Sequence, residues 1–134
     1  MSIHQEATFP VPPERVYELL TDGAKFAAAT GKSAKIEASD GATFSIFGGY
    51  IHGRQVELVR GQRIVQAWRG SDWDSGVYSL VRFTLTRDGK GTKLTVDHDA
   101  YPEGMWPMHS SWHEHLSTNW PVLYFEPFAK YLAG

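Results

Sequence analysis

The chain has 134 residues, which fits one domain, and it contains no cysteine, which excludes disulfides, thiolate metal sites and thiol nucleophiles. Its net charge is −2 and its basic residues form no stripe, so we expect no nucleic-acid partner. No apolar stretch reaches the length of a membrane span and the N-terminal residues do not form a signal sequence, so we expect a cytoplasmic protein.

The first residues predict one strand followed by two helices. Apolar and polar residues alternate over residues 3–9, which predicts a half-buried strand that Pro10 ends. Within residues 11–22, prolines suited to a first helical turn precede an apolar stripe of Val16, Leu19 and Leu20. A second, short helix is expected over residues 24–29, closed by Gly31.

The middle of the chain follows a strand pattern up to residue 101. Glycine-containing reversals at 40–41, 60–63 and 88–91 indicate turns between strands. We therefore expect six strands, near residues 34–38, 42–47, 50–59, 63–69, 77–87 and 92–101.

The C-terminal part predicts one long amphipathic helix. After Pro107 the apolar residues recur with a helical period as far as Leu132, and eight aromatic residues lie beyond residue 100. Pro121 and Pro127 each remove a backbone hydrogen bond from this helix, so we expect a kink or an offset there rather than two helices.

The order of these elements is β-α-α-β6-α, which predicts an α+β fold. A curved, seven-stranded antiparallel sheet needs apolar cover on its concave face, and only the long helix is large enough to supply it. The sheet should therefore wrap around the C-terminal helix.

Alternation places polar side chains among the inward-facing residues of several strands. Gln66, Ser79 and His98 share their strand faces with apolar neighbours, as does Gln5. A buried polar group without a partner costs about 1–3 kcal/mol, so these groups must be hydrogen bonded. They fit either the wall of a ligand cavity or a hydrogen-bonded core.

The cavity interpretation names residues on the strands and on the long helix. For each tryptophan among them, ordinary core packing is the alternative. The candidates are Phe44, Ile46, Gln66, Trp68, Ser79, Phe83, His98, Trp112, Trp120 and Tyr124.

The mouth of such a cavity would lie between the last strand and the long helix. Met105, Trp106 and Met108 occur there, and flexible thioether and aromatic groups could adapt to varied apolar ligands. The alternative is that they plug the end of the core.

No motif in the sequence compels catalysis or metal binding. His109 and His113 have a helical i, i+4 spacing, but no third ligand is evident and the zinc-protease pattern is absent. We expect neither a metal nor a cofactor.

Several segments resemble the C-terminal domain of the activator of the heat-shock protein 90 ATPase. The specific ones are Phe44 to Leu58, which includes Gly48-Gly49-Tyr50-Ile51-His52-Gly53, and Arg63 to Arg69, which ends in Trp-Arg. Similarity continues through Trp73 and through residues 76–79, 91–94, 97–98, 119–120, 124–128 and 130–132. The resemblance implies a helix-grip fold of the START-like (SRPBCC) superfamily, with residues 1–134 as a single domain of this type.

The sequence favours the first of three functions, and the other two are alternatives. The first is a non-catalytic domain that binds a small apolar or amphipathic ligand between helix and sheet, as many members of the superfamily do. The second is a co-chaperone-like regulator of the heat-shock protein 90 ATPase, with the chaperone as partner. The third is a cyclase- or hydrolase-type enzyme, for which His98 with a carboxylate partner is the only acid–base pair the sequence suggests.

Overall fold

The computed structural model describes residues 3–71, 76–99 and 120–133. The described helices are α1 (Pro13–Thr21), α2 (Gly23–Thr30) and α4 (Glu126–Ala133), with a 3₁₀ turn η1 (Phe47–Gly49) and a π-helical segment η2 (Pro121–Phe125). No helix in these ranges has both the length and the apolar sequence needed to cross a membrane.

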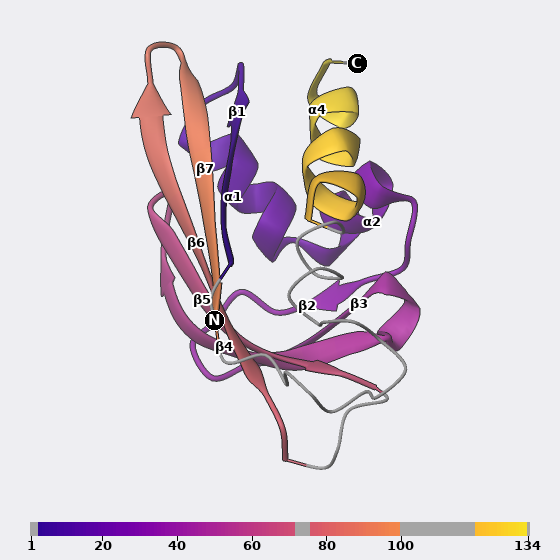
Figure 1. The fold of residues 1–134 in the computed structure, drawn as a ribbon. Coiled ribbons are helices and arrows are strands. Elements are labelled where there is room, and N and C mark those ends of the chain that lie inside the picture. The colour runs from indigo at the N-terminus through magenta and orange to yellow at the C-terminus, as the bar shows by residue number, and fades with distance from the viewer. Residues whose placement is uncertain (1–2, 72–75, 100–119, 134) are drawn as a thin grey trace.

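Seven antiparallel strands form one curved sheet, in the order β1-β7-β6-β5-β4-β3-β2 (Figure 1). The strands are β1 (Ile3–Phe9), β2 (Lys35–Ile36), β3 (Thr43–Ile46), β4 (Ile51–Val59), β5 (Arg63–Gly70), β6 (Ser79–Asp88) and β7 (Gly91–Asp99). Every predicted strand is present, although β2 is reduced to two residues. The first strand pairs along its whole length with the last, from Ile3 opposite His98 to Phe9 opposite Thr92.

The two N-terminal helices begin and end as their sequences suggest. Pro13 starts α1, and the buried face of that helix carries Val16, Leu19 and Leu20. Asp22 then caps α2, because its Oδ1 accepts hydrogen bonds from the backbone N–H of Ala24 at 2.9 Å and of Lys25 at 3.1 Å.

The C-terminal helix is continuous over the described residues, with an offset instead of a break. Over residues 121–125 the chain is π-helical, and the N–H of Glu126 reaches back five residues to the carbonyl of Pro121. In α-helical geometry the ring of Pro127 would crowd the carbonyl four residues earlier, and a wider turn relieves that crowding. The predicted offset is confirmed, and the part of the predicted helix before residue 120 lies outside the described residues.

The conformation of the turn between β3 and β4 was not predicted from the sequence, which placed Phe47 at the end of a strand. Phe47 has a positive φ of 53°, which is unusual for a residue other than glycine, and Gly48 and Gly49 continue the left-handed conformation. This backbone course brings the Phe47 ring against Phe26 of α2 and Tyr124 of η2, with centroids 5.6 and 5.7 Å apart. Contact with this cluster compensates for the strained backbone.

Gly53 of β4 has a packing reason to be glycine. A Cβ atom at this position would lie 1.8 Å from the carbonyl oxygen of Ala67 on the neighbouring strand. Any side chain would therefore push β4 and β5 apart, so this glycine of the resemblance motif is required by the sheet itself.

The core lies inside the curve of the sheet, where Figure 1 shows α1, α2 and α4 on the concave side. The expected helix-grip arrangement is confirmed. Trp120, Tyr124 and Phe128 are buried at successive turns of the C-terminal helix. The first two contact rings of β5 and β6, and Phe128 contacts rings of β1 and α2.

We predict that Trp120→Ala lowers the free energy of unfolding by about 3–5 kcal/mol, because a ring that is only 3% exposed would leave a cavity. Denaturant unfolding measures the change. Tyr131→Ala, on the same helix but 39% exposed, is the matched control and should cost about 1 kcal/mol or less. Equal unfolding midpoints for wild type and Trp120→Ala would mean that the helix is wrongly placed.

Candidate functional site

Every cavity candidate that the structure describes is buried. This set comprises Phe44, Ile46, Gln66, Trp68, Ser79, Phe83, His98, Trp120 and Tyr124, each no more than 4% exposed. Trp112 and the predicted mouth residues Met105, Trp106 and Met108 lie outside the described residues. Ring contacts and hydrogen bonds join all of them except Phe44 and Ile46, and their role in ligand binding stays a prediction.

The space between helix and sheet is occupied by aromatic rings. Trp120 lies with its ring centroid 4.6 Å from that of Tyr124, 5.1 Å from Trp68, 5.7 Å from Phe83 and 5.8 Å from His98. These separations are those of directly packed rings. Over the residues that the structure describes, this region is a packed core, and a ligand cavity is not shown there.

The inward polar groups satisfy one another along the sheet. The indole N–H of Trp68 donates to Oε1 of Gln66 at 2.7 Å, and Nε2 of Gln66 donates to Oε1 of Gln55 at 3.0 Å. Nε2 of Gln55 then reaches the backbone carbonyl of Glu37 at 3.4 Å. This series of hydrogen bonds links two strands, β5 and β4, and ends at the backbone next to a third, β2.

Sequence reasoning missed Gln55, which is 1% exposed and is the central member of this series. Alternation from Ile51 through Gly53 would have placed it inward, opposite Gln66. The pattern is obscured by a bulge between Gln55 and Glu57, which leaves Val56 52% exposed and shifts the alternation in the rest of β4.

A second buried polar group joins the long helix to the sheet. The indole N–H of Trp120 donates to Nδ1 of His98 at 3.3 Å, and Nε2 of His98 lies 2.8 Å from Oγ of Ser79. An indole N–H can only donate, so Nδ1 must accept and the proton of the neutral imidazole sits on Nε2. His98 therefore donates to Ser79.

This tautomer decides what the pair can do chemically. A general base must accept the hydroxyl proton of a serine nucleophile, whereas His98 presents an N–H to Ser79. Burial also lowers the pKa of His98 to about 3, so the ring is neutral near pH 7. Asp97 and Asp99, its neighbours along β7, belong to the opposite face of the strand. The arrangement is that of a structural hydrogen-bonded group.

Within residues 3–71, 76–99 and 120–133, no group of three potential ligand side chains could hold a metal ion. His4 hydrogen bonds to Asp97 at 2.6 Å and to Glu6 at 3.3 Å on the exposed side of the sheet. The i, i+4 pair of His109 and His113 lies outside the described residues.

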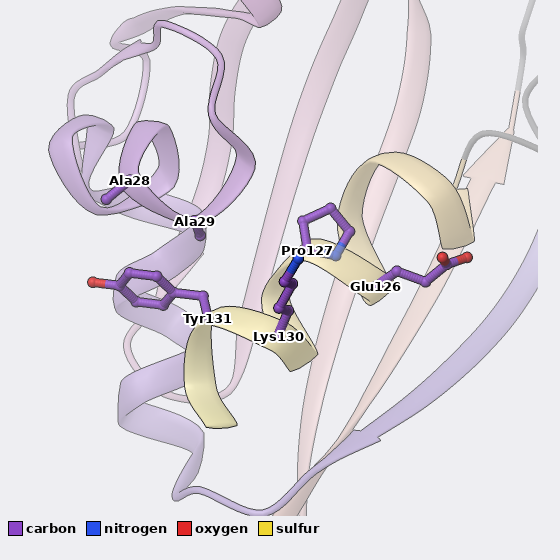
Figure 2. Close-up of a pocket in the computed structure, with 6 residues that line it drawn as sticks. All are labelled: Ala28, Ala29, Glu126, Pro127, Lys130 and Tyr131. Atoms are coloured by element: carbon purple, nitrogen blue, oxygen red, sulfur yellow. The ribbon is translucent and has the colours of Figure 1, made fainter. Parts of the chain in front are cut away.

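A surface groove of about 440 Å³ lies between α2 and α4 (Figure 2). Two helices form it, rather than the helix and the sheet, and no cavity candidate contributes to it. Its lining residues are Ala28, Ala29, Glu126, Pro127, Lys130 and Tyr131.

Comparison with known families gives a match over almost the whole chain. Residues 10–133 match the sequence model of the family described as Activator of Hsp90 ATPase homolog 1-like protein. The activator of 90 kDa heat shock protein ATPase homolog of Dictyostelium discoideum is 37% identical over 82 residues, which cover 61% of this chain and 21% of that protein. The Hsp90 co-chaperone AHA1 of Saccharomyces cerevisiae is 28% identical over 111 residues, with 77% and 31% covered. The chain thus spans between a fifth and a third of the length of these relatives.

Solved structures repeat the fold. The crystal structure of an HSP90 activator from Plasmodium falciparum has a TM-score of 0.91 and 25% identity, and the match covers 99% of this chain and 96% of that one. A protein from Mesorhizobium loti has a TM-score of 0.82 at 20% identity, which bears on the fold alone.

The buried histidine predicts a pH-dependent stability. The pKa of His98 is about 3 in the folded chain and about 6.5 when unfolded, so below pH 6.5 the unfolded state binds a proton that the folded state excludes. Stability should therefore fall as the pH drops from 6.5 toward 3, by about 1.4 kcal/mol per pH unit from this group.

Unfolding measured between pH 5 and 7 reports mainly on histidine, because the unfolded-state pKa values of Asp and Glu, about 3.9 and 4.3, lie below this window. Exposed His4, whose pKa is raised by its hydrogen bond to Asp97, acts in the opposite direction. His98→Gln should be less stable at pH 7 but should lose most of the slope. An unchanged slope in this variant would contradict the assignment.

Proposed function

Because the chain belongs to the family of Activator of Hsp90 ATPase homolog 1-like proteins, we propose that it binds heat-shock protein 90 and regulates the ATPase activity of that chaperone. In this proposal residues 1–134 act as one START-like domain, in the cytoplasm together with the chaperone. The names of the Dictyostelium and Saccharomyces relatives favour this co-chaperone interpretation over the ligand-binding one.

The observation that carries the proposal is the match to the Plasmodium HSP90 activator. The match covers 96% of that crystallised chain, so a chain of nearly the same extent as this one bears the activator name. The larger relatives have additional sequence beyond the matched part. We therefore expect a single domain of this size to bind the chaperone.

The packed interior supports an activity located on the surface. The described candidates between helix and sheet contact one another through rings and hydrogen bonds. Such a core gives the domain a rigid shape, and a rigid surface loses little conformational freedom when it binds a partner protein.

An ATPase assay tests the proposal. Purified chain is titrated into the heat-shock protein 90 of the same organism, and turnover is measured with and without a specific inhibitor of the chaperone so that other ATPases are subtracted. We expect a saturable change in turnover, with the destabilised Trp120→Ala variant as the control for a folded domain. Unchanged turnover at saturating chain, together with no binding by calorimetry, would overturn the proposal.

A second candidate function is the binding of an apolar or amphipathic ligand, favoured by one observation. Gln66, Ser79 and His98 place polar side chains among the buried apolar residues of the sheet, a composition that ligand sites share, and a ligand would replace the hydrogen bonds that they make within the core. In this hypothesis the candidates of the described core would form the wall, and Met105, Trp106 and Met108 the mouth.

The ligand hypothesis predicts saturable binding of a fatty acid or an apolar fluorophore, with quenching of tryptophan emission. Trp106→Ala should change the affinity while altering stability by no more than about 1 kcal/mol, as expected for a residue outside the core. Emission that does not saturate with added ligand would rule this function out. A large loss of stability with unchanged uptake would instead make Trp106 a core residue.

A further inference from the structure

The outer face of the sheet carries arginines around an apolar centre. This surface, called the arginine face below, comprises Arg54, Arg63, Arg82, Val65, Ala67 and Leu80 on β4, β5 and β6. In Figure 1 all the described helices lie on the other, concave side of these strands. The arginine face is thus a sheet face that no described helix covers.

The strand register makes these side chains neighbours. Val65 is paired with Arg82, and Ala67 is paired with Leu80 on one side and with Arg54 on the other. Arg54 and Arg82 are exposed, and Leu80 is 38% exposed although it is a large apolar residue near the centre of a sheet. Cationic and apolar groups are therefore interleaved on one solvent-facing surface.

A hollow of about 430 Å³ lies within this surface, with Val65 and Thr84 among its lining. Nε of Arg63 donates to Oε1 of Glu57 at 2.7 Å, and both residues also line the hollow, together with Arg82. The hydrogen bond and the charge of Arg63 hold the pKa of Glu57 below its usual range, and the charge of Arg82 acts in the same direction. Two positive charges, those of Arg63 and Arg82, thus lie beside the single negative charge of Glu57. The net positive charge can attract a second carboxylate.

The next strand outward is acidic. Asp97 of β7 is paired with Arg82, and Asp99 is paired with Leu80. Asp97 is already hydrogen bonded to His4. The sheet face therefore changes from basic on β4–β6 to acidic at the C-terminal end of β7, so a charged partner would be attracted to the one and repelled from the other.

We propose that the arginine face docks an acidic segment of a partner protein, whose carboxylates pair with Arg82 and Arg63 while its apolar side chains cover Val65, Ala67 and Leu80. Under the proposed function, on which this identification of the partner rests, that partner is heat-shock protein 90. Arginine is enriched in protein interfaces because its planar guanidinium binds a carboxylate in bidentate fashion and also packs against apolar groups. The acidic border on β7 disfavours a polyphosphate ligand, which a continuous basic surface would suit.

Two binding measurements test this proposal, one without the chaperone. In the first, a synthetic peptide of alternating glutamate and leucine is titrated into isotopically labelled protein, and backbone amide shifts are followed. In the second, the affinity for the cognate heat-shock protein 90 is measured by calorimetry. Both are repeated at higher salt, which should weaken binding through exposed charge pairs.

The diagnostic variant is Arg82→Glu, and Arg87→Glu is its matched control. Arg87 lies on the same strand, near the hairpin tip and outside the hollow, and undergoes the same change of charge. We expect Arg82→Glu to weaken both peptide and chaperone binding by about tenfold or more, and Arg87→Glu to leave both within about twofold. Peptide-induced shifts should fall on β4, β5 and β6. Thermal unfolding checks that each variant is folded, and Arg82→Gln replaces Arg82→Glu if the latter is not.

The outcomes separate this proposal from the proposed function. Chaperone binding by wild type that is unchanged in Arg82→Glu overturns docking at the arginine face but leaves the proposed function standing. Peptide binding at β4–β6 without any chaperone binding supports the acidic-segment site and overturns the proposed function. Equal weakening by Arg82→Glu and Arg87→Glu, or no peptide binding by wild type, overturns the arginine face as a specific site.

Discussion

One buried indole side chain, that of Trp120, fixes the C-terminal helix against the sheet. Trp120 packs against rings from β5, β6 and η2, and its N–H is also committed to His98 of β7. The ring contacts set how closely the C-terminal helix approaches the sheet, and the hydrogen bond sets its rotation about its own axis. Because the imidazole accepts this bond, its other nitrogen must donate, and Ser79 is the group positioned to accept it. Helix position, imidazole tautomer and serine orientation are therefore one coupled arrangement.

The sequence predicted most of this arrangement, and the failures have local physical causes. Strict alternation placed Gln66, Ser79 and His98 on the inner face correctly, because a period of two is unambiguous in a regular strand. Gln55 was missed because a bulge interrupts the period next to it. The left-handed conformation of Phe47 was missed because it is unfavourable for phenylalanine, and tertiary ring contacts compensate for it.

Whether the interior is filled or hollow was beyond sequence reasoning for a different reason. Inward-facing polar residues are compatible with a ligand and with one another, and the choice depends on distances between strands that are far apart in the sequence. Here Gln66 lies within 3.0 Å of Gln55 and His98 within 2.8 Å of Ser79, so these groups are satisfied internally. The charged outer face raised no such question from the sequence, because exposed arginines have no periodic partner pattern to read. The three-dimensional structure is needed to show that Arg82 lies beside Val65 and Arg63 beside Glu57.

The pairing of β1 with β7 has a consequence for how the chain folds. These strands come from opposite ends of the described β-region, yet they are joined by a seven-residue register. Closing the long loop between them costs conformational entropy, and the stabilising contacts form only after the loop has closed. The hairpins β4–β5 and β6–β7 have no such delay, since short turns connect their strands. We therefore expect the central hairpins to form early and β1 to be the last strand to pair. In a nascent chain, β1 is made first and stays unpaired until β7 has been synthesised.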